Sequence, residues 1–256
     1  MMRLSVSKFS GRGGREINED YLGFCGNEAI GCFVLADGAG GHEGGAIASK
    51  TVVQQVLKAF SLTPTVSREM VQASIATART ALNQARRQHP DQKNMNTTLA
   101  ILLLDVDHKE AYWAHLGDSR IYLLRKGRAY ALTRDHSILQ SMIDAGLTQG
   151  TPRGSTERNT LYASVGSTDI PDRTVCEAPL ALQMGDAFLL CSDGFWESVD
   201  EGIMEMTLRL SNSSEQWLQN MLAYIAEPSA ETQDNFSALG VWLGDQEEAT
   251  RIQRLS

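Results

Sequence analysis

The sequence predicts an α+β layered sandwich, because strands and helices follow one another in blocks instead of alternating one by one. Several apolar, strand-like runs are joined by turns too short for a crossover, so neighbouring strands should be antiparallel. Two amphipathic helical stretches lie between the first strand and this strand block, and two more lie near the C-terminus. The 256 residues contain no internal repeat and no low-complexity linker, so we expect one domain.

The first part of the chain predicts a buried strand followed by two helices. Residues 29–36 are apolar, and this strand ends at Asp37-Gly38. After a glycine-rich segment, 38–45, apolar residues recur at helical spacing in two successive stretches. These two stripes consist of Ala46, Val53, Leu57 and Phe60, followed by Val71, Ile75, Ala78, Leu82 and Ala85.

The remainder of the chain predicts further strands, three helices and a surface flap. The flap is polar with Gly and Pro at 148–159, and we place its outer limits near 146–165. A short helix before it should end at Gly146, a residue suited to a helix C-terminus. The predicted strands are 97–104, 110–116, 120–124, 129–132, 187–191 and 236–243, and the predicted helices are 137–145, 200–210 and 215–225.

Composition and charge restrict the partners. The formal net charge is -8, the pI is about 5.2, and no basic run interrupts the acidic balance, so nucleic acid and anionic membrane are not expected partners. No apolar segment approaches the roughly 20 residues of a membrane span. The four cysteines form no CxxC pair, which fits a reducing compartment. We therefore expect a cytoplasmic protein, and a monomer.

Acidic residues recur next to the predicted strands. A single Asp-Gly step is usually a plain turn, but here every acid flanks an apolar strand. If the strands pair in one sandwich, their ends can converge on one rim and bring together carboxylates that favour a hard metal ion. The acidic steps are Asp37-Gly38, Asp193-Gly194, Asp234-Asn235 and Gly117-Asp118-Ser119-Arg120.

These segments, with others in the same order along nearly the whole chain, resemble the bacterial branch of the metal-dependent protein phosphatases of the 2C type. The resemblance implies a four-layer α-β-β-α sandwich, in which two antiparallel sheets are flanked by helix pairs. It also implies a phosphatase domain over residues 1–245 and a C-terminal tail, 246–256. The matching segments are 15–20 (REINED), 37–42 (DGAGGH), Thr97-Thr98, 117–120 (GDSR), 132–137 (LTRDHS), 192–194 (SDG) and 234–235 (DN).

The resemblance implies a metal site that uses Mg²⁺ or Mn²⁺. In it, Asp37 would bridge two core ions, the Gly38 carbonyl would complete one, and Asp193 and Asp234 would hold the other. Asp118 would hold a third ion, as in many bacterial members. Two such ions lower the pKa of a bridging water, which would attack phosphoserine or phosphothreonine without a phosphoenzyme.

The resemblance also implies roles around these ions. Arg15 would bind the substrate phosphate, for which its planar donor fork is suited. Glu19, Asp20 and Asn235 would support the site without contacting the ions themselves. The partners would be phosphorylated proteins, above all a Ser/Thr kinase and its targets, and type VI secretion is one context to consider.

The chain departs from the family pattern at two positions. Asn96 stands where many relatives have Gly, and Ala39 stands where relatives have Met or, in animal enzymes, a His that protonates the leaving group. The acid for the leaving group is therefore unassigned. His42 lies three positions further on, and we expect it to be structural more than catalytic.

Other phosphatase and phosphate-binding mechanisms fit less well. No Arg stands six positions after any cysteine, as a cysteine-based phosphatase requires, and neither a Gly-Lys-Ser/Thr loop nor a GxSxG elbow occurs. Asp105 and Asp107 resemble the DxD start of haloacid-dehalogenase-type phosphatases, but Lys109 breaks that pattern, so we interpret 105–109 as a polar turn.

A further alternative is a phosphatase-like module that binds a phosphoprotein or a metal without turnover. Such modules have lost metal ligands, whereas the acids that we expect to form this site are all present.

Overall fold

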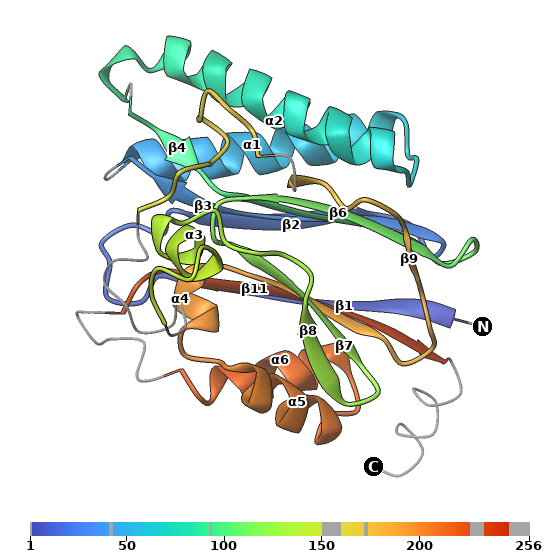
Figure 1. The fold of residues 1–256 in the computed structure, drawn as a ribbon. Coiled ribbons are helices and arrows are strands. Elements are labelled where there is room, and N and C mark those ends of the chain that lie inside the picture. Colours follow the sequence, from blue (N-terminus) through green and yellow to red (C-terminus); the bar gives the residue numbers. More distant parts are fainter. Residues whose placement is uncertain are drawn as a thin grey trace.

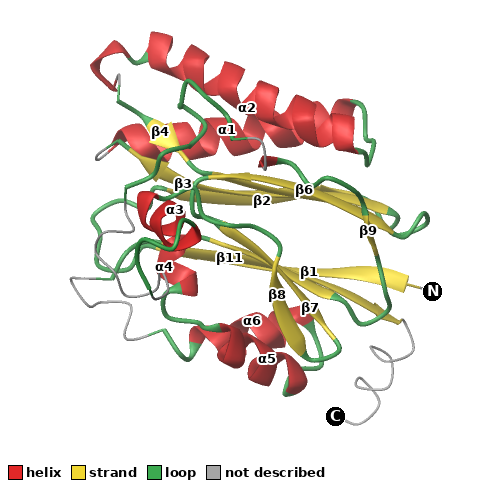
Figure 2. Ribbon diagram, viewed as in Figure 1, coloured by secondary structure: helices red, strands yellow, loops and turns green. Residues whose placement is uncertain are grey.

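Two antiparallel sheets lie face to face between two pairs of helices, which confirms the predicted four-layer α+β sandwich (Figures 1 and 2). The structure is a computed structural model that describes residues 2–40, 43–92, 94–149, 160–171, 174–225 and 233–245. The predicted tail and most of the predicted flap lie outside these residues. At the end of the flap region, Ala163 and Val165 are buried in the core.

The first sheet joins the two ends of the described chain. Its strand order is β1-β11-β10-β7-β8, and β1 pairs with β11 in a register that places Met2 opposite Asp245. The strands of this sheet are β1 (Met2–Gly11), β7 (Arg120–Arg125), β8 (Arg128–Ala131), β10 (Ala187–Cys191) and β11 (Phe236–Asp245).

The second sheet has the strand order β2-β3-β5-β6-β9, with β4 beside β3. Its strands are β2 (Asp20–Gly26), β3 (Ile30–Ala39), β4 (Asn96–Thr97), β5 (Leu99–Asp105), β6 (Glu110–Leu116) and β9 (Leu180–Ala181). β1 and β2 are therefore edge strands of different sheets. They lie on the same side of the sandwich, with a groove between them.

Helices α1 (Glu43–Leu62) and α2 (Arg68–Gln88) cover the second sheet, and α5 (Glu201–Arg209) and α6 (Ser214–Leu222) cover the first (Figure 1). Two shorter helices, α3 (Ile138–Asp144) and α4 (Asp193–Trp196), lie at one end of the sandwich. Four helices begin at a side-chain cap that accepts a hydrogen bond from a backbone N–H of the first turn. These caps are Ser67, Ser137, Asp200 and Ser213.

The core has three layers, because side chains of the central strands alternate between the two faces of their sheet. In β3, Cys32, Val34 and Ala36 pack toward α1 and α2, whereas Phe33 and Leu35 pack against the other sheet. This strand is buried on both faces, which explains why its sequence is continuously apolar.

The structure differs from the sequence-based expectations in a few elements. β1 and β2 were not predicted, although the alternation of Leu4 and Val6 with polar residues in β1 is a period-two signal. β3 continues through Asp37 to Ala39, so Asp37 lies inside the strand and not after its end. The predicted strand 97–104 is interrupted at Thr98. Among the described residues, no helix combines the length and the hydropathy that a membrane span requires.

Candidate metal and phosphate site

The predicted acidic residues come together at the end of the sandwich where β3 ends and β11 begins (Figure 1). Asp193 starts α4 directly after β10, Asp234 precedes β11, and Asp118 lies in the turn between β6 and β7. Burial is the main reason that the pKa of Asp37 is raised well above its usual value, and repulsion from four other carboxylates raises this pKa further. These are Asp20, Asp193, Asp118 and Asp234.

Asp20 and Asp37 are direct partners in the β2–β3 ladder. Two like charges in this position repel each other, and Asp20 is buried. Burial raises the pKa of Asp20 to about 7, and the charges of Asp193 and Asp234 act in the same direction. Acidic groups therefore gather here without enough neighbouring cations to stabilise their charged forms, and a bound cation would supply that stabilisation.

Asp20 is held from the opposite sheet. The Ser192 hydroxyl donates a hydrogen bond of 2.7 Å to Asp20 Oδ2, and it accepts one of 2.9 Å from the Ser237 N–H. Asp20 Oδ1 is buried and has no hydrogen-bond partner among the described residues. A buried oxygen without a partner costs free energy, so this atom is suited to a ligand such as a metal ion or a water molecule bound to one.

The backbone of Asp37 is fixed by Thr97, at the end of β4, and by Thr98, between β4 and β5. Thr97 Oγ1 donates to the Asp37 carbonyl oxygen, and the Asp37 N–H donates to Thr98 Oγ1, both at 2.8 Å. Thr98 Oγ1 also shares a hydrogen bond of 2.7 Å with Ser119 Oγ. The strand that carries Asp37 is thus tied to the turn that carries Asp118.

Gly38 occupies a position where no side chain fits. A Cβ atom there would overlap the Gly45 carbonyl of α1 and lie 2.8 Å from the Glu19 carbonyl oxygen. The Gly38 N–H donates to that Glu19 oxygen at 3.1 Å. Glycine therefore lets the first turn of α1 pass directly over β3, and the Glu19 carboxylate lies against this turn, where a helix N-terminus favours negative charge.

Asn235 connects three parts of the loop that precedes β2. Its Oδ1 accepts from the Glu19 N–H at 2.8 Å, and its Nδ2 donates to the carbonyls of Arg12 and Ile17 at 2.8 and 3.1 Å. Asn235 therefore holds the loop that carries Glu19 and Arg15, and its predicted role beside bound ions stays a prediction.

Arg15 lies at the site but binds a predicted metal ligand. Its Nη2 donates to Asp234 Oδ2 at 2.8 Å, and Asp234 Oδ1 accepts from the Asn235 N–H. The Arg15 side chain is 58% exposed, so its guanidinium group is accessible from solvent. The charge of Asp234 raises the pKa of Arg15, which keeps this side chain cationic.

The Asp118 turn is held by a cluster that includes Trp196 of α4. The Trp196 indole N–H donates to the Asp118 carbonyl oxygen at 2.9 Å. The Arg120 guanidinium group stacks on the Trp196 ring at 3.5 Å and forms two hydrogen bonds of 2.8 Å with Asp135. Because α4 begins at Asp193, this cluster connects two of the predicted metal ligands.

His136 is not suited to protonate a leaving group. Its ring stacks on His115 at 4.3 Å, and its Nδ1 accepts from the Gly117 N–H at 3.3 Å. Burial lowers the pKa of His136 to about 3, so it is neutral and holds the Gly117 turn. His42, the other histidine considered from the sequence, lies outside the described residues.

Asn96 stands where many relatives have Gly. Its Nδ2 donates a hydrogen bond of 2.7 Å to Ser164 Oγ.

Several supporting residues were not assigned a role from the sequence. Ser192, Thr97 and Thr98 belong to segments that carried the family resemblance, which was the available signal. Ser237 and Trp196 had no such signal, because only the folded chain brings them to Asp20 and to the Asp118 turn.

The residues at this end of the sandwich fit a hard divalent cation in chemistry, since carboxylate and carbonyl oxygens are the donors that Mg²⁺ and Mn²⁺ prefer. No three His, Cys, Asp or Glu side chains within the described ranges are already arranged to hold an ion. Within the described part of the chain, Asp234 is paired with Arg15.

The position of Asp105 excludes the alternative in which it is the nucleophile of a haloacid-dehalogenase-type phosphatase. Asp105 ends β5, at the opposite end of that strand from Thr98 and the acidic cluster. Its carboxylate accepts from the His108 N–H at 2.8 Å and contacts the His108 ring, which closes the polar turn predicted at 105–109.

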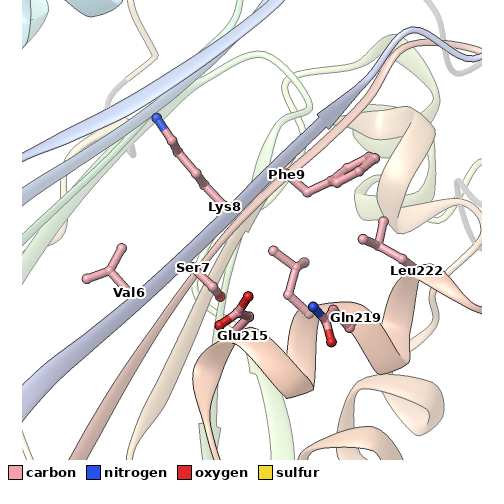
Figure 3. A pocket seen from close by; sticks show the side chains of 8 residues that line it. Val6, Ser7, Lys8, Phe9, Glu215, Gln219 and Leu222 are labelled. Carbon is pink, nitrogen blue, oxygen red and sulfur yellow. The ribbon is translucent and has the colours of Figure 1, made fainter.

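The cavities on the first sheet are separate from most of the acidic cluster. A cavity of about 310 Å³ lies between β1 and α6, and none of its lining residues is a predicted site residue (Figure 3). Lys8 extends away from α6 in this view, toward Phe24 of β2. A groove of about 380 Å³ on that other side, between β1 and β2, reaches Asp20.

Comparisons with known proteins give a consistent result. The sequence profile described as protein phosphatase 2C matches residues 11–234. The chain is 31% identical over 175 residues to the serine/threonine protein phosphatase PstP of Mycobacterium tuberculosis, which covers 67% of this chain and 33% of PstP. It therefore spans about a third of the length of PstP. It is 34% identical over 187 residues to the protein phosphatase PhpP of Streptococcus pneumoniae, covering 70% of this chain and 74% of PhpP.

Solved structures have the same fold. The catalytic domain of PstP in complex with two manganese ions matches with a TM-score of 0.79 at 24% identity, over 96% of this chain and 100% of that chain. PppA of Pseudomonas aeruginosa, described as a key regulatory component of the type VI secretion system, matches with a TM-score of 0.72 at 26% identity, over 94% of this chain and 98% of that chain.

Proposed function

The chain belongs to the protein phosphatase 2C family, and on this basis we propose that it is a metal-dependent protein phosphatase that hydrolyses phosphoserine and phosphothreonine. The similarity to PstP and PhpP, which are named as protein phosphatases, supports this activity. The structural observation that supports it most directly is the crowding of Asp37 by four other carboxylates beside a solvent-accessible Arg15.

In this proposal, Asp37, Asp193, Asp234 and the Gly38 carbonyl hold two Mn²⁺ or Mg²⁺ ions, and Asp118 holds a third. When bound, such ions supply an activated water and neutralise charge on the phosphoryl group. The binding of two manganese ions by the PstP catalytic domain, which shares this fold, supports the choice of metal.

The residues around the ions have distinct tasks. Arg15 binds the phosphate through two N–H donors of its guanidinium group and positions the phosphorus atom beside the carboxylate cluster. Asp20 and Glu19 accept hydrogen bonds from water at the site, and the orphaned Asp20 Oδ1 supports this role. Ser192 and Ser237 keep Asp20 in place, and Asn235 keeps the Arg15 loop in place.

The proposal also covers the substrates, the oligomeric state and the cellular location of the enzyme. The substrates are phosphorylated proteins, among them a Ser/Thr kinase and its targets, and the enzyme acts as a cytoplasmic monomer. The likeness to PppA supports type VI secretion as one setting in which to look for the substrate.

The test is hydrolysis of a chromogenic aryl phosphate and of phosphoserine and phosphothreonine peptides, with and without Mn²⁺. We expect turnover that requires Mn²⁺ and is abolished in Asp37→Asn. If the purified protein binds Mn²⁺ and phosphopeptide but releases no phosphate, it is a binding module and the proposal is wrong.

A further inference from the structure

Two cysteines lie directly opposite each other in the β2–β3 hairpin. Cys25 of β2 is the register partner of Cys32 of β3. The hairpin turn holds this register, because the Asn27 N–H donates to the Ile30 carbonyl at 2.9 Å and Asn27 Oδ1 accepts from two N–H groups of the turn. The two residues are therefore kept side by side by the hairpin itself.

The spacing of this pair is compatible with a disulfide. The turn bond at Asn27–Ile30 lies two residues away, so Cys25 and Cys32 occupy a hydrogen-bonded position of the ladder. Cα atoms in such pairs are about 5.5 Å apart, and disulfides span roughly 4.4 to 6.8 Å between Cα atoms. The neighbouring pair, Gly26 opposite Gly31, belongs to the other face of the sheet and leaves the cysteine face unaffected.

The two thiols differ in environment. Both face the helical layer, where Cys32 is fully buried, whereas Cys25 is partly exposed and donates to the Leu57 carbonyl at 3.5 Å. A hydrogen bond between the thiols lowers the pKa of Cys25 and raises that of Cys32. Cys25 is therefore the thiol that a soluble oxidant reaches and the one that ionises more easily.

We propose that Cys25 and Cys32 are a modification site, at which a peroxide converts the two thiols into a reversible cross-strand disulfide. The Cys25 thiolate attacks one peroxide oxygen and becomes a sulfenic acid, while the other oxygen leaves as hydroxide. Cys32 then attacks the Cys25 sulfur and displaces the second oxygen as water. Two thiols and one hydrogen peroxide give one disulfide and two waters, and a small dithiol reverses the reaction.

The other two cysteines provide an internal control. Cys191 of β10 is fully buried and lies between Arg120 and Ala238 in the first sheet. Cys176 is buried, and its sulfur accepts from the Trp113 N–H at 3.4 Å. Neither has a cysteine as its partner across the strands, so neither should form an intramolecular disulfide.

The experiment uses the whole 256-residue chain and does not measure phosphatase activity, so its outcome is independent of the proposed function. Wild-type, Cys25→Ser, Cys32→Ser and Cys176→Ser proteins are treated with hydrogen peroxide, blocked with a maleimide and digested with trypsin and a glutamate-specific protease. Glu28 lies between the two cysteines, and no other Glu, Lys or Arg does. Cleavage after Glu28 therefore separates the two fragments unless a disulfide joins them.

We expect linked fragments, with the loss of two hydrogen atoms, in the wild type and in Cys176→Ser. In the wild type, the number of thiols counted in denaturant should fall from the four of the sequence to two, and a dithiol should restore it. Cys25→Ser should lose no thiol, and Cys32→Ser should gain oxygen at Cys25 because no second thiol traps the sulfenic acid.

Two results would overturn the proposal. In the first, Cys25 of the wild type is oxidised to sulfinic acid and no linked fragments form. In the second, all four thiols remain intact after peroxide treatment. The wild-type digest decides the question even if a serine variant fails to fold, and Cys32→Ala is a second variant for the buried position. Thermal melts of each variant verify folding.

Discussion

Arg15 and Asp234 form an ion pair in which Nη2 and Oδ2 are 2.8 Å apart. In the proposed function, Arg15 binds the substrate phosphate and Asp234 binds a metal ion. A cation at Asp234 competes with the guanidinium group for the same carboxylate, because both are positive. Arg15 and Asp234 would therefore exchange partners when metal and phosphate bind.

Arg15→Ala should raise KM for phosphopeptides by roughly 10- to 100-fold, since a charge-assisted contact contributes about 1.5 to 3 kcal/mol. Arg15→Lys should restore only part of this loss, because an ammonium group lacks the planar fork. Steady-state kinetics at saturating Mn²⁺ provide the measurement. Arg128→Ala, at an exposed position of β8, serves as a control. Unchanged KM in Arg15→Ala would remove this residue from the phosphate site.

Asp37→Asn should abolish aryl-phosphate hydrolysis at every Mn²⁺ concentration, because the carboxylate predicted to serve both core ions is lost. Asp193→Asn and Asp234→Asn should each cause a severe loss with slight recovery at high Mn²⁺, whereas Asp118→Asn should retain a measurable rate. A Mn²⁺ titration of the four variants tests this order. Near-normal turnover by Asp37→Asn would contradict the two-ion site.

In the absence of metal, Asp37→Asn should be more stable than the wild type. Burial and four neighbouring carboxylates disfavour the Asp37 charge, and an amide removes that charge. Thermal melts in a chelator measure this effect. A lower melting temperature for the variant would mean that hydrogen bonds to the Asp37 carboxylate outweigh the repulsion.

The stability of the metal-free protein should fall as the pH rises from about 4 to 7. The pKa of Asp20 is about 7 in the folded protein and about 3.9 in an unfolded chain. Between these values the folded state retains a proton that the unfolded state has lost, so each rise in pH favours unfolding until the folded pKa is passed. Urea unfolding across this range measures the slope.

Asp20→Asn should flatten this decline by at least about 1 kcal/mol, because the variant has no proton to lose at this position. Asp107→Asn, in the exposed turn after β5, is the matched control and should retain the wild-type slope. If both variants follow the wild type, Asp20 does not titrate in this window.

Trp196→Phe should weaken binding of the third ion while leaving the core ions in place. The substitution keeps an aromatic ring under Arg120 but removes the N–H that holds the Asp118 carbonyl. Loss of one hydrogen bond of this kind costs about 1 kcal/mol, which corresponds to a change of about fivefold in the affinity of the weakest Mn²⁺ site. Isothermal titration with Mn²⁺ measures the affinities of the sites separately.

Trp217→Phe is a matched control for this prediction, because Trp217 is also buried and its indole N–H also donates to a backbone carbonyl, that of Met204. It lies in α6, outside the acidic cluster. Equal weakening of Mn²⁺ binding in both variants would indicate general destabilisation and not a specific role of Trp196.

Local patterns predicted most of the fold, and the exceptions have physical causes. Helices α1 and α2 were predicted because their apolar residues follow a helical period, and all members of the second stripe, from Val71 to Ala85, are buried. β1 and β2 were missed because half-exposed edge strands carry little continuous apolar sequence. Thr98 lies within a predicted strand, but its hydroxyl accepts the Asp37 N–H, so the strand is interrupted at this residue and resumes where Thr97 pairs with Gly38.

The sequence by itself determined the family, the layered fold and the acids next to strands, because strand-flanking Asp-Gly steps are local and their order along the chain is specific. Only the tertiary structure decided how these acids are used. Asp20 faces Asp37 because β2 pairs with β3, and Ser192 reaches Asp20 because the β10 and β11 ends meet this rim from the other sheet. Contacts between residues so distant in sequence depend on strand order and sheet packing, which no local pattern specifies.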